Sequence, residues 1–285
     1  MPYTHLTDRS LLTVTGEPAE HFLQVLITAD LVKLGVCEAR PSALLTPQGK
    51  ILFDFLISRI DGGFRLDCAA SSRDALLKRL TLYRLRTKVD IETSDEPVFA
   101  AWGLEKVPDG AVADRRFADD STVRFYGSAP VDLDGVSPEE YVAHRVRAGV
   151  AEAEADFPAD DVYPHDVLMD QNAGVSFAKG CFVGQEVVSR MQHRGTARRR
   201  LMIVRGEGHL GRGVTVTAEG KAIGTVIAAT GDTGMALMRI DRLAQALARG
   251  AVVAADGVPV ETSIPPWAGY ALPSADAATR AGEDE

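Results

Sequence analysis

The β-rich stretch that begins at Arg198 is the feature that most constrains the fold of this chain. Short segments of strand-forming residues recur there, separated by glycines, with a turn signal about every ten residues. The predicted strands cover residues 201–204, 214–217, 222–228, 235–240 and 252–254. Many short strands at even spacing are typical of a small barrel or sandwich, so we expect a β-rich domain over residues 197–270.

The preceding part of the chain mixes strands and helices. Apolar runs of strand length cover 10–14, 51–57 and 64–68, and Asp-Gly-Gly at 61–63 predicts a hairpin between the last two. Segments near Phe22 and Leu76 have helical spacing instead. The sequence therefore predicts an α+β fold. We expect residues 1–195 to form two mixed α/β lobes, divided near 95–105.

The clearest helix start in the chain is at Pro138, where Ser137 and Glu140 form a capping box, and Gly149 is expected to end the helix. An acidic connector with seven carboxylates follows at 152–170. We expect it to be a solvated loop rather than a metal-binding cluster. The tail, 271–285, has almost no large apolar residue and is predicted to be disordered.

The composition excludes some functional classes. The net charge of −9 argues against direct binding of nucleic acid, and no apolar run reaches the length of a membrane helix. The first residues lack the basic and apolar segments of a secretion signal. We therefore expect a cytoplasmic protein that contacts neither nucleic acid nor membrane.

The three cysteines are widely spaced, and no Cys-x-x-Cys pair is present for a zinc or iron–sulfur site. We expect Cys37 and Cys68 to be small buried residues. Cys181 differs because it lies in Lys-Gly-Cys-Phe-Val-Gly-Gln-Glu, residues 179–186. A helix is expected to begin near Gly184 or Gln185.

A thiol between glycines, near Lys179 and before a helix N-terminus, lies in positive potential, which favours the reactive thiolate. Cys181 is therefore a candidate nucleophile, redox centre or transient metal ligand. The alternative is a cysteine that only packs under a glycine-rich turn.

Residues 179–186 resemble the K-G-C-Y-x-G-Q-E motif of the YgfZ family, with Phe182 in place of the tyrosine. Further similarity covers about residues 6–267. The matching positions are Arg9, Gly16, Phe22-Leu23-Gln24, Thr28-Ala29-Asp30, Gly49-Lys50, Arg194-Gly195 and Pro266-Trp267.

The resemblance implies a fold like that of the T-protein (aminomethyltransferase) of glycine cleavage, a ring of subdomains around a folate pocket. It also implies a tetrahydrofolate-type cofactor and a role in building or repairing iron–sulfur clusters of client enzymes, including one that modifies tRNA. Cys181 and Lys179 are then the reactive residues. The residues expected at the cofactor are Gly180, Phe182, Gly184, Gln185, Glu186, Arg190, Arg194 and Asp54.

Two departures from T-proteins argue against glycine-cleavage activity. No G-Y-T-G-E-type segment occurs between residues 95 and 145. Asp54 is the nearest equivalent of the essential aspartate, but a basic residue, Lys50, replaces one of the glycines that precede it. An ordinary structural carboxylate is the alternative at this position.

A cationic run follows the motif and comprises Arg190, His193, Arg194, Arg198, Arg199, Arg200 and Arg205. It is either a solvated face that balances the acidic connector, or a site for the glutamate tail of a folate or for an acidic partner.

Three functions stay open on the sequence. The first is a folate-binding accessory protein for iron–sulfur cluster assembly, whose partners are reduced folate and client enzymes or assembly proteins. The second is a one-carbon transferase that acts on a small amine. The third is a non-catalytic interaction scaffold.

Overall fold

The computed structural model describes residues 1–274. Two compact units make up the chain. Unit 1 comprises Met1–Tyr141, Glu152–Pro164 and Asn172–Ser189, and unit 2 comprises Val142–Ala151, His165–Gln171 and the chain from Arg190 onward. The predicted boundaries at 1–195, 95–105 and 197–270 stay predictions. The predicted disorder at 271–285 falls mostly on residues 275–285, which lie outside the described part of the chain.

Unit 1 is built on one mixed sheet of ten strands in the order β10-β1-β7-β9-β8-β3-β4-β5-β2-β6. The strands are β1 (Pro2–His5), β2 (Arg9–Thr15), β3 (Glu38–Leu45), β4 (Ile51–Ile60), β5 (Gly63–Ala69), β6 (Asp90–Ser94), β7 (Val98–Ala101), β8 (Ala111–Asp114), β9 (Val123–Tyr126) and β10 (Asp134–Gly135). The predicted hairpin is present, since β4 and β5 pair in antiparallel register from Phe55–Cys68 to Ile60–Gly63.

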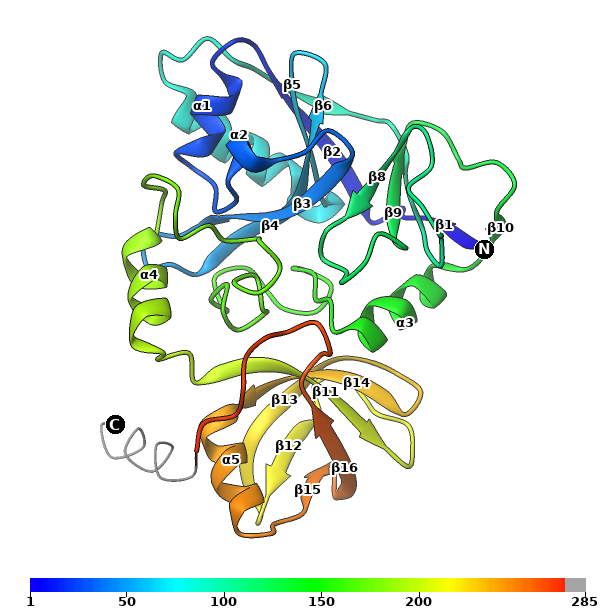
Figure 1. The fold of residues 1–285 in the computed structure, drawn as a ribbon, viewed down its shortest axis with the longest axis vertical. Helices are drawn as coiled ribbons and strands as arrows, with labels where there is room; N and C mark the ends of the chain where they lie inside the picture. Colours follow the sequence, from blue (N-terminus) through cyan, green and yellow to red (C-terminus); the bar gives the residue numbers. More distant parts are fainter. Residues whose placement is uncertain (275–285) are drawn as a thin grey trace. The chain divides into compact units, whose positions relative to one another are not determined.

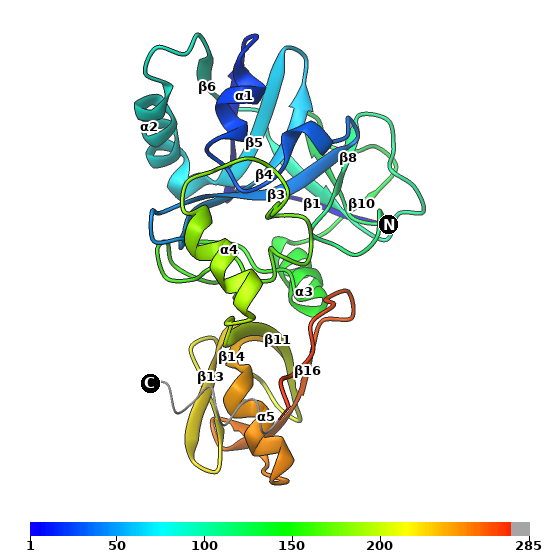
Figure 2. The same cartoon turned by 60° about the vertical axis from the view of Figure 1, so that its left-hand side comes forward.

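Short helices cover the β2–β5 part of this sheet. They are α1 (Ala19–Gln24) and α2 (Arg73–Arg84), with the 3-10 turns η1 (Leu31–Lys33) and η2 (Ala70–Ser72) (Figures 1 and 2). Phe22, Leu76 and Leu80 pack with Leu12 and Phe55 of the strands in one buried cluster. This cluster is the core that holds β4 and β5 in place, and both strands carry charged residues of the site described below.

Unit 2 contains a closed barrel of six strands in the order β11-β14-β13-β12-β15-β16. The strands are β11 (Arg199–Gly206), β12 (Thr215–Ala218), β13 (Lys221–Thr230), β14 (Thr233–Arg239), β15 (Val253–Ala255) and β16 (Val258–Ser263). Its core includes Val204, Val226 and Met238, which are fully buried. The predicted barrel is therefore confirmed.

Two further helices contribute residues to unit 2, α3 (Pro138–Ala148) in part and α5 (Ile240–Ala248) entirely. The helix α3 begins and ends where the capping box and Gly149 predict. The helix α5 was not predicted, nor was strand β16. Ile240, Leu243 and Ala246 of α5 are buried at helical spacing and pack in the barrel core, a signal that the short strands on either side obscured.

Candidate functional site

The 179–186 segment forms an exposed loop that leads into a helix. The helix α4 (Gln185–Arg194) begins where the sequence predicts (Figure 1). The thiol-bearing residue Cys181 is exposed, whereas the neighbouring Phe182 is buried. The loop therefore presents its cysteine to solvent and is anchored through the next side chain.

Lys179 fixes the start of this loop. Its Nζ donates hydrogen bonds to the carbonyl oxygens of Ile27 (2.7 Å) and Ala29 (2.8 Å). The ammonium group also lies 5.3 Å from the centre of the Phe182 ring. Burial lowers the pKa of Lys179 to about 8, although Asp30 acts in the opposite direction. Because Nζ donates to backbone carbonyl oxygens, Lys179 has the contacts of a residue that positions the loop.

Gly184 fixes the other end of the loop through a close backbone contact. It has a φ of +77°, and a Cβ at this position would lie 2.5 Å from the carbonyl oxygen of Thr46. Gly49, with a φ of +82°, packs reciprocally, since its Cβ would lie 3.0 Å from the Cβ of Val187 and 3.3 Å from the carbonyl oxygen of Gly184. Two separate glycine positions in the sequence thus meet, and the β3–β4 turn supports the first turn of α4.

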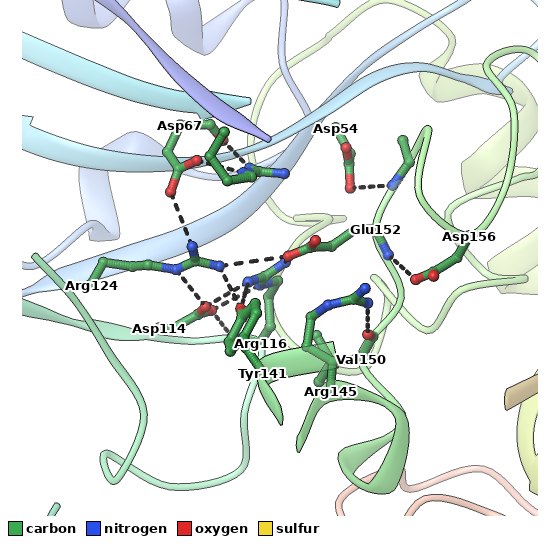
Figure 3. Close-up of polar contacts among 12 residues, drawn as sticks. Asp54, Asp67, Asp114, Arg116, Arg124, Tyr141, Arg145, Val150, Glu152 and Asp156 are labelled. Atoms are coloured by element: carbon green, nitrogen blue, oxygen red, sulfur yellow. Dashed lines mark hydrogen bonds and ion pairs between the residues drawn. The ribbon is translucent and has the colours of Figure 1, made fainter. Parts of the chain in front are cut away.

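A second group of functional side chains is a buried network of charges in unit 1 (Figure 3). Its members are Arg9, Asp67, Asp114, Arg116, Arg124, Tyr141 and Glu152, which come from four strands, a loop, α3 and the segment after it. We call this set the buried ion network. Buried charges are stable only when they are paired and hydrogen-bonded.

Arg116 lies at the centre of the buried ion network. Its Nε and Nη2 donate to Asp114 at 2.9 and 2.6 Å, and its Nη1 donates to Glu152 at 2.6 Å. Arg124, fully buried, donates to Asp114 at 3.2 Å and to the Tyr141 hydroxyl at 2.6 Å. Burial acts to raise the pKa of Asp114, but the two guanidinium groups outweigh it and lower that pKa.

Asp54 lies beside the buried ion network without an arginine of its own (Figure 3). Its Oδ2 accepts a hydrogen bond from the Ala153 amide at 3.2 Å, and its enclosed Oδ1 has no hydrogen-bond partner among residues 1–274. Burial raises the pKa of Asp54, and Arg9 only partly offsets this effect. The three arginines of the network already face three carboxylates, so the additional carboxyl group is the one that favours the protonated form.

The acidic connector is not the solvated loop that we expected. Glu152, Asp156 and Asp166 are 3%, 5% and 2% exposed, and the Asp170 side chain is fully buried. Each is held by a donor, Glu152 by Arg116 and Asp156 by the Glu152 amide. The prediction was wrong for Glu152, Asp166 and Asp170 because their arginine partners lie outside the connector. Glu154, Asp160 and Asp161 are exposed, as expected.

The cationic run divides into a buried and an exposed part. Arg199, whose side chain is 33% exposed, pairs with Asp166 (2.8 Å), and the buried Arg200 pairs with Asp170 (2.7 Å), so these two arginines balance the connector through direct ion pairs. Arg190 and Arg194, on α4, are exposed. The expectation of a buried Cys37 was also wrong, since this residue is exposed, whereas Cys68 is buried as predicted.

The structure brings the predicted site residues together in two places. Gly180, Phe182, Gly184, Gln185 and Glu186 form the loop and the start of α4, with Arg190 and Arg194 further along the helix. Asp54 lies on β4 beside the buried ion network. The sequence did not indicate this network, since Arg9 stood out only as a position shared with the family and Glu152 only as part of the acidic connector. The one signal of the network was charged residues inside short apolar strands, such as Arg124 between Val123 and Phe125.

Residues 1–274 contain no group of three or more His, Cys, Asp or Glu side chains arranged to hold a metal ion. Over the same residues, no helix combines the length and the apolar character needed to cross a membrane.

Comparison with known proteins decides the family. Residues 198–270 match the family model described as CAF17, C-terminal beta-barrel domain. The mitochondrial iron–sulfur cluster assembly factor IBA57 of Mus musculus is 32% identical over 279 residues, which cover 84% of this chain and 77% of the mouse protein. The Homo sapiens protein of the same name is 30% identical over 305 residues, which cover 92% of this chain and 84% of the human protein. This chain belongs to the IBA57 family.

Comparison with solved structures shows the fold. The glycine cleavage system aminomethyltransferase T of Bartonella henselae superposes with a TM-score of 0.73 at 16% sequence identity, over 92% of this chain and 84% of that protein. The predicted aminomethyltransferase-like fold is thus confirmed.

The IBA57 relatives refine one prediction and correct another. The motif resembles that of YgfZ, and the mouse, human and Pyricularia oryzae relatives make the family IBA57. The expected cytoplasmic location was wrong, because the mouse, human and Pyricularia oryzae relatives are all described as mitochondrial.

Proposed function

We propose that this protein acts in iron–sulfur cluster assembly, that it binds a reduced folate, and that Cys181 supplies a thiol for transient contact with the cluster. The observation that carries the proposal is the exposed Cys181 on a loop fixed at both ends, in a chain whose relatives are named iron–sulfur cluster assembly factors. Thiolate is a preferred ligand of iron in clusters. The cluster is in this account the cargo and not a resident cofactor.

The fixed ends of the loop support a role in handing on a ligand. Lys179 binds the carbonyl oxygens at Ile27 and Ala29, and Gly184 lies against the 46–49 turn. A thiol on a positioned loop loses less conformational entropy on binding than one on a free segment. Lys179 therefore influences Cys181 by holding the loop in position, since its ammonium group donates to backbone carbonyl oxygens.

The polar groups beside the buried ion network fit a reduced pterin. The edge of such a ring carries adjacent N–H donors and a carbonyl acceptor. Asp54 Oδ1 is an enclosed acceptor without a protein partner in the described chain, and Arg124 Nη1 is an enclosed donor without a hydrogen bond there, 3.7 Å from Asp67. We assign Asp54, with the neighbouring Glu152 and Arg124, to the ring, and the exposed Arg190 and Arg194 to the glutamate tail or an acidic partner. When bound, a reduced folate supplies a carrier for one-carbon units, and the residues named here orient it.

Complementation with single-residue variants tests the proposed role of Cys181. Cys181→Ser keeps size and polarity, so folding and folate binding should be retained, while support of iron–sulfur enzyme activity in cells that lack the endogenous factor should be lost. Cys37→Ser is the matched control, because Cys37 is also exposed but lies outside the loop. Full complementation by Cys181→Ser would contradict the thiol role and leave the scaffold function.

One observation favours a second function, one-carbon transfer to a small amine. Asp54 is an enclosed carboxyl whose pKa is raised by burial, which suits a group that exchanges a proton with substrate. Turnover of a reduced folate with an amine acceptor, lost in Asp54→Asn and retained in Cys181→Ser, would establish that function.

A further inference from the structure

Unit 2 contains a cavity of about 290 Å³ that the proposed function does not use. Met191 and Gln192 of α4, Arg200 of β11 and Ile240 of α5 form its walls, together with Tyr270 and His165. We call it the barrel pocket. Pockets for small molecules typically measure about 300–1,000 Å³ and combine apolar walls with a few placed polar groups. The barrel pocket is at the lower end of that range and has this composition, so its ligand is small.

Arg200 is the placed polar group. Its side chain is only 10% exposed. Nη1 alone makes its hydrogen bonds, to both carboxylate oxygens of Asp170 (2.7 and 2.9 Å) and to the carbonyl oxygen of His165 (3.0 Å). The guanidinium carbon lies 5.2 Å from the centre of the Tyr270 ring. The hydrogen bonds of Nη1 and the Tyr270 ring on one face therefore fix the orientation of the guanidinium.

The other edge of this guanidinium has no hydrogen-bond partner among residues 1–274. Nε and Nη2 of Arg200 make no hydrogen bond within the described chain, although the residue lines the barrel pocket. Two parallel N–H groups on one edge of a guanidinium match the two oxygens of a carboxylate. An arginine that is nine-tenths buried, held rigidly and left with this edge unused is suited to bind an anion.

The acidic residues near the barrel pocket do not oppose an anion. Asp170 is held by Arg200, and Asp241, which also lines the pocket, accepts two bonds from Arg239 at 3.0 and 2.8 Å. Each carboxylate thus faces its own guanidinium. Met191, Ile240 and the Tyr270 ring supply an apolar part of the wall, and the other polar side chains of the lining, Gln192, His165 and Arg198, carry no negative charge.

We propose that the barrel pocket binds a small organic monocarboxylate. Its carboxylate group accepts two hydrogen bonds from Nε and Nη2 of Arg200, and its apolar body, of the size of one ring, packs against Met191, Ile240 and Tyr270. The planar fork suits an anion that offers two acceptor oxygens, and the apolar wall selects an organic acid over a bare inorganic ion.

Calorimetry and ligand-observed NMR on the full chain test this assignment, with benzoate as the probe, benzamide as its uncharged counterpart, and inorganic phosphate as a competitor. We expect benzoate to bind and benzamide to bind at least tenfold more weakly. Arg200→Lys keeps the charge but removes the fork, and should weaken benzoate binding at least tenfold. Arg212→Gln, an exposed arginine of the same unit outside the pocket, should leave binding unchanged.

Met191→Glu places a carboxylate at the half-exposed rim and should reduce benzoate binding even if Arg200→Lys does not fold, while Met191→Leu should not. The proposal is overturned if benzoate does not bind at millimolar concentration, or if benzamide binds equally well. It is also overturned if phosphate binds more tightly than benzoate. Displacement of benzoate by saturating tetrahydrofolate would overturn it too, because the pocket would then belong to the folate tail.

Discussion

The three cysteines differ in what surrounds each sulfur atom, and this difference sets their reactivity. Cys68 is buried in the core of unit 1, and burial raises the pKa of its thiol to about 12. Cys37 and Cys181 are exposed. Because the thiolate is the form that reacts, the exposed Cys37 and Cys181 are available to reagents and the buried Cys68 is inert.

Alkylation of the native protein at pH 7.5 should therefore modify Cys37 and Cys181 and leave Cys68 unmodified until the protein unfolds. Mass spectrometry of peptides after timed quenching measures this order. In Cys37→Ser, a single fast-reacting thiol should remain, at Cys181. Early labelling of Cys68 would show that the core of unit 1 opens more readily than its packing indicates.

Asp54 and Asp114 are two buried carboxyl groups whose contributions to folding stability depend on pH in opposite directions. Burial raises the pKa of Asp54, so the stability associated with its protonated form is present at low pH and is lost as pH rises through the pKa of the folded state. Asp54→Asn should thus gain melting temperature relative to the unmodified protein as pH increases from 5 to 8. The new amide oxygen can still accept the Ala153 hydrogen bond.

Asp114→Asn is the control for Asp54→Asn. The net lowering of the Asp114 pKa gives stability that is present above the unfolded pKa and lost as pH falls through the folded one. Removing this charge from the buried ion network should cost about 3–5 kcal/mol at neutral pH, and less in acid. Differential scanning fluorimetry across pH distinguishes the two, and equal pH profiles would contradict the assignment of the proton to Asp54.

At the scale of elements, the loop before α4 depends on backbone contacts that only glycine permits. Gly184 lies against the carbonyl oxygen of Thr46, at the turn between β3 and β4. Gly180, the other glycine of the loop, has no heavy atom within 4 Å of the position that a Cβ would take there. Of the two glycines, only Gly184 is a point of close approach.

Gly184→Ala should destabilise the protein, since a left-handed backbone alone costs about 1–3 kcal/mol and the added methyl group meets the carbonyl oxygen of Thr46. A loss of about 2 kcal/mol corresponds to about 4–8 °C in melting temperature. Gly180→Ala should stay within about 0.5 kcal/mol of the unmodified protein. Equal effects of the two substitutions would show that the 46–49 turn does not support α4.

At the scale of the whole molecule, ligand binding offers the most direct test of the folate proposal. A reduced folate at one hundred times its dissociation constant should stabilise the folded state by about 2.7 kcal/mol. That corresponds to about 5–10 °C in melting temperature. Cys181→Ser should retain the shift, and Glu152→Gln should reduce it. An unchanged melting temperature across a panel of reduced folates would remove the cofactor and leave the proposed thiol role standing alone.

Features that depend on local pattern could be predicted from the sequence. The glycine-separated strands predicted the barrel, the capping box located α3, and residues 179–186 indicated the loop that carries Cys181 and the start of α4. Each of these depends on neighbours within a few residues, because turn conformation, capping and helix starts are set locally. The aminomethyltransferase-like fold was expected from the family resemblance alone.

The burial of particular charges, and the partners that they meet, depend on the folded chain. Arg116 meets Glu152 across 36 positions and Arg9 meets Asp67 across 58, so no local pattern marks these pairs. The same holds for Gly49 and Gly184, whose contact is made by packing. A buried carboxylate is stable only where the fold brings hydrogen-bond donors to it, and these donors are guanidinium groups at Glu152 and Asp170 and a backbone amide at Asp156.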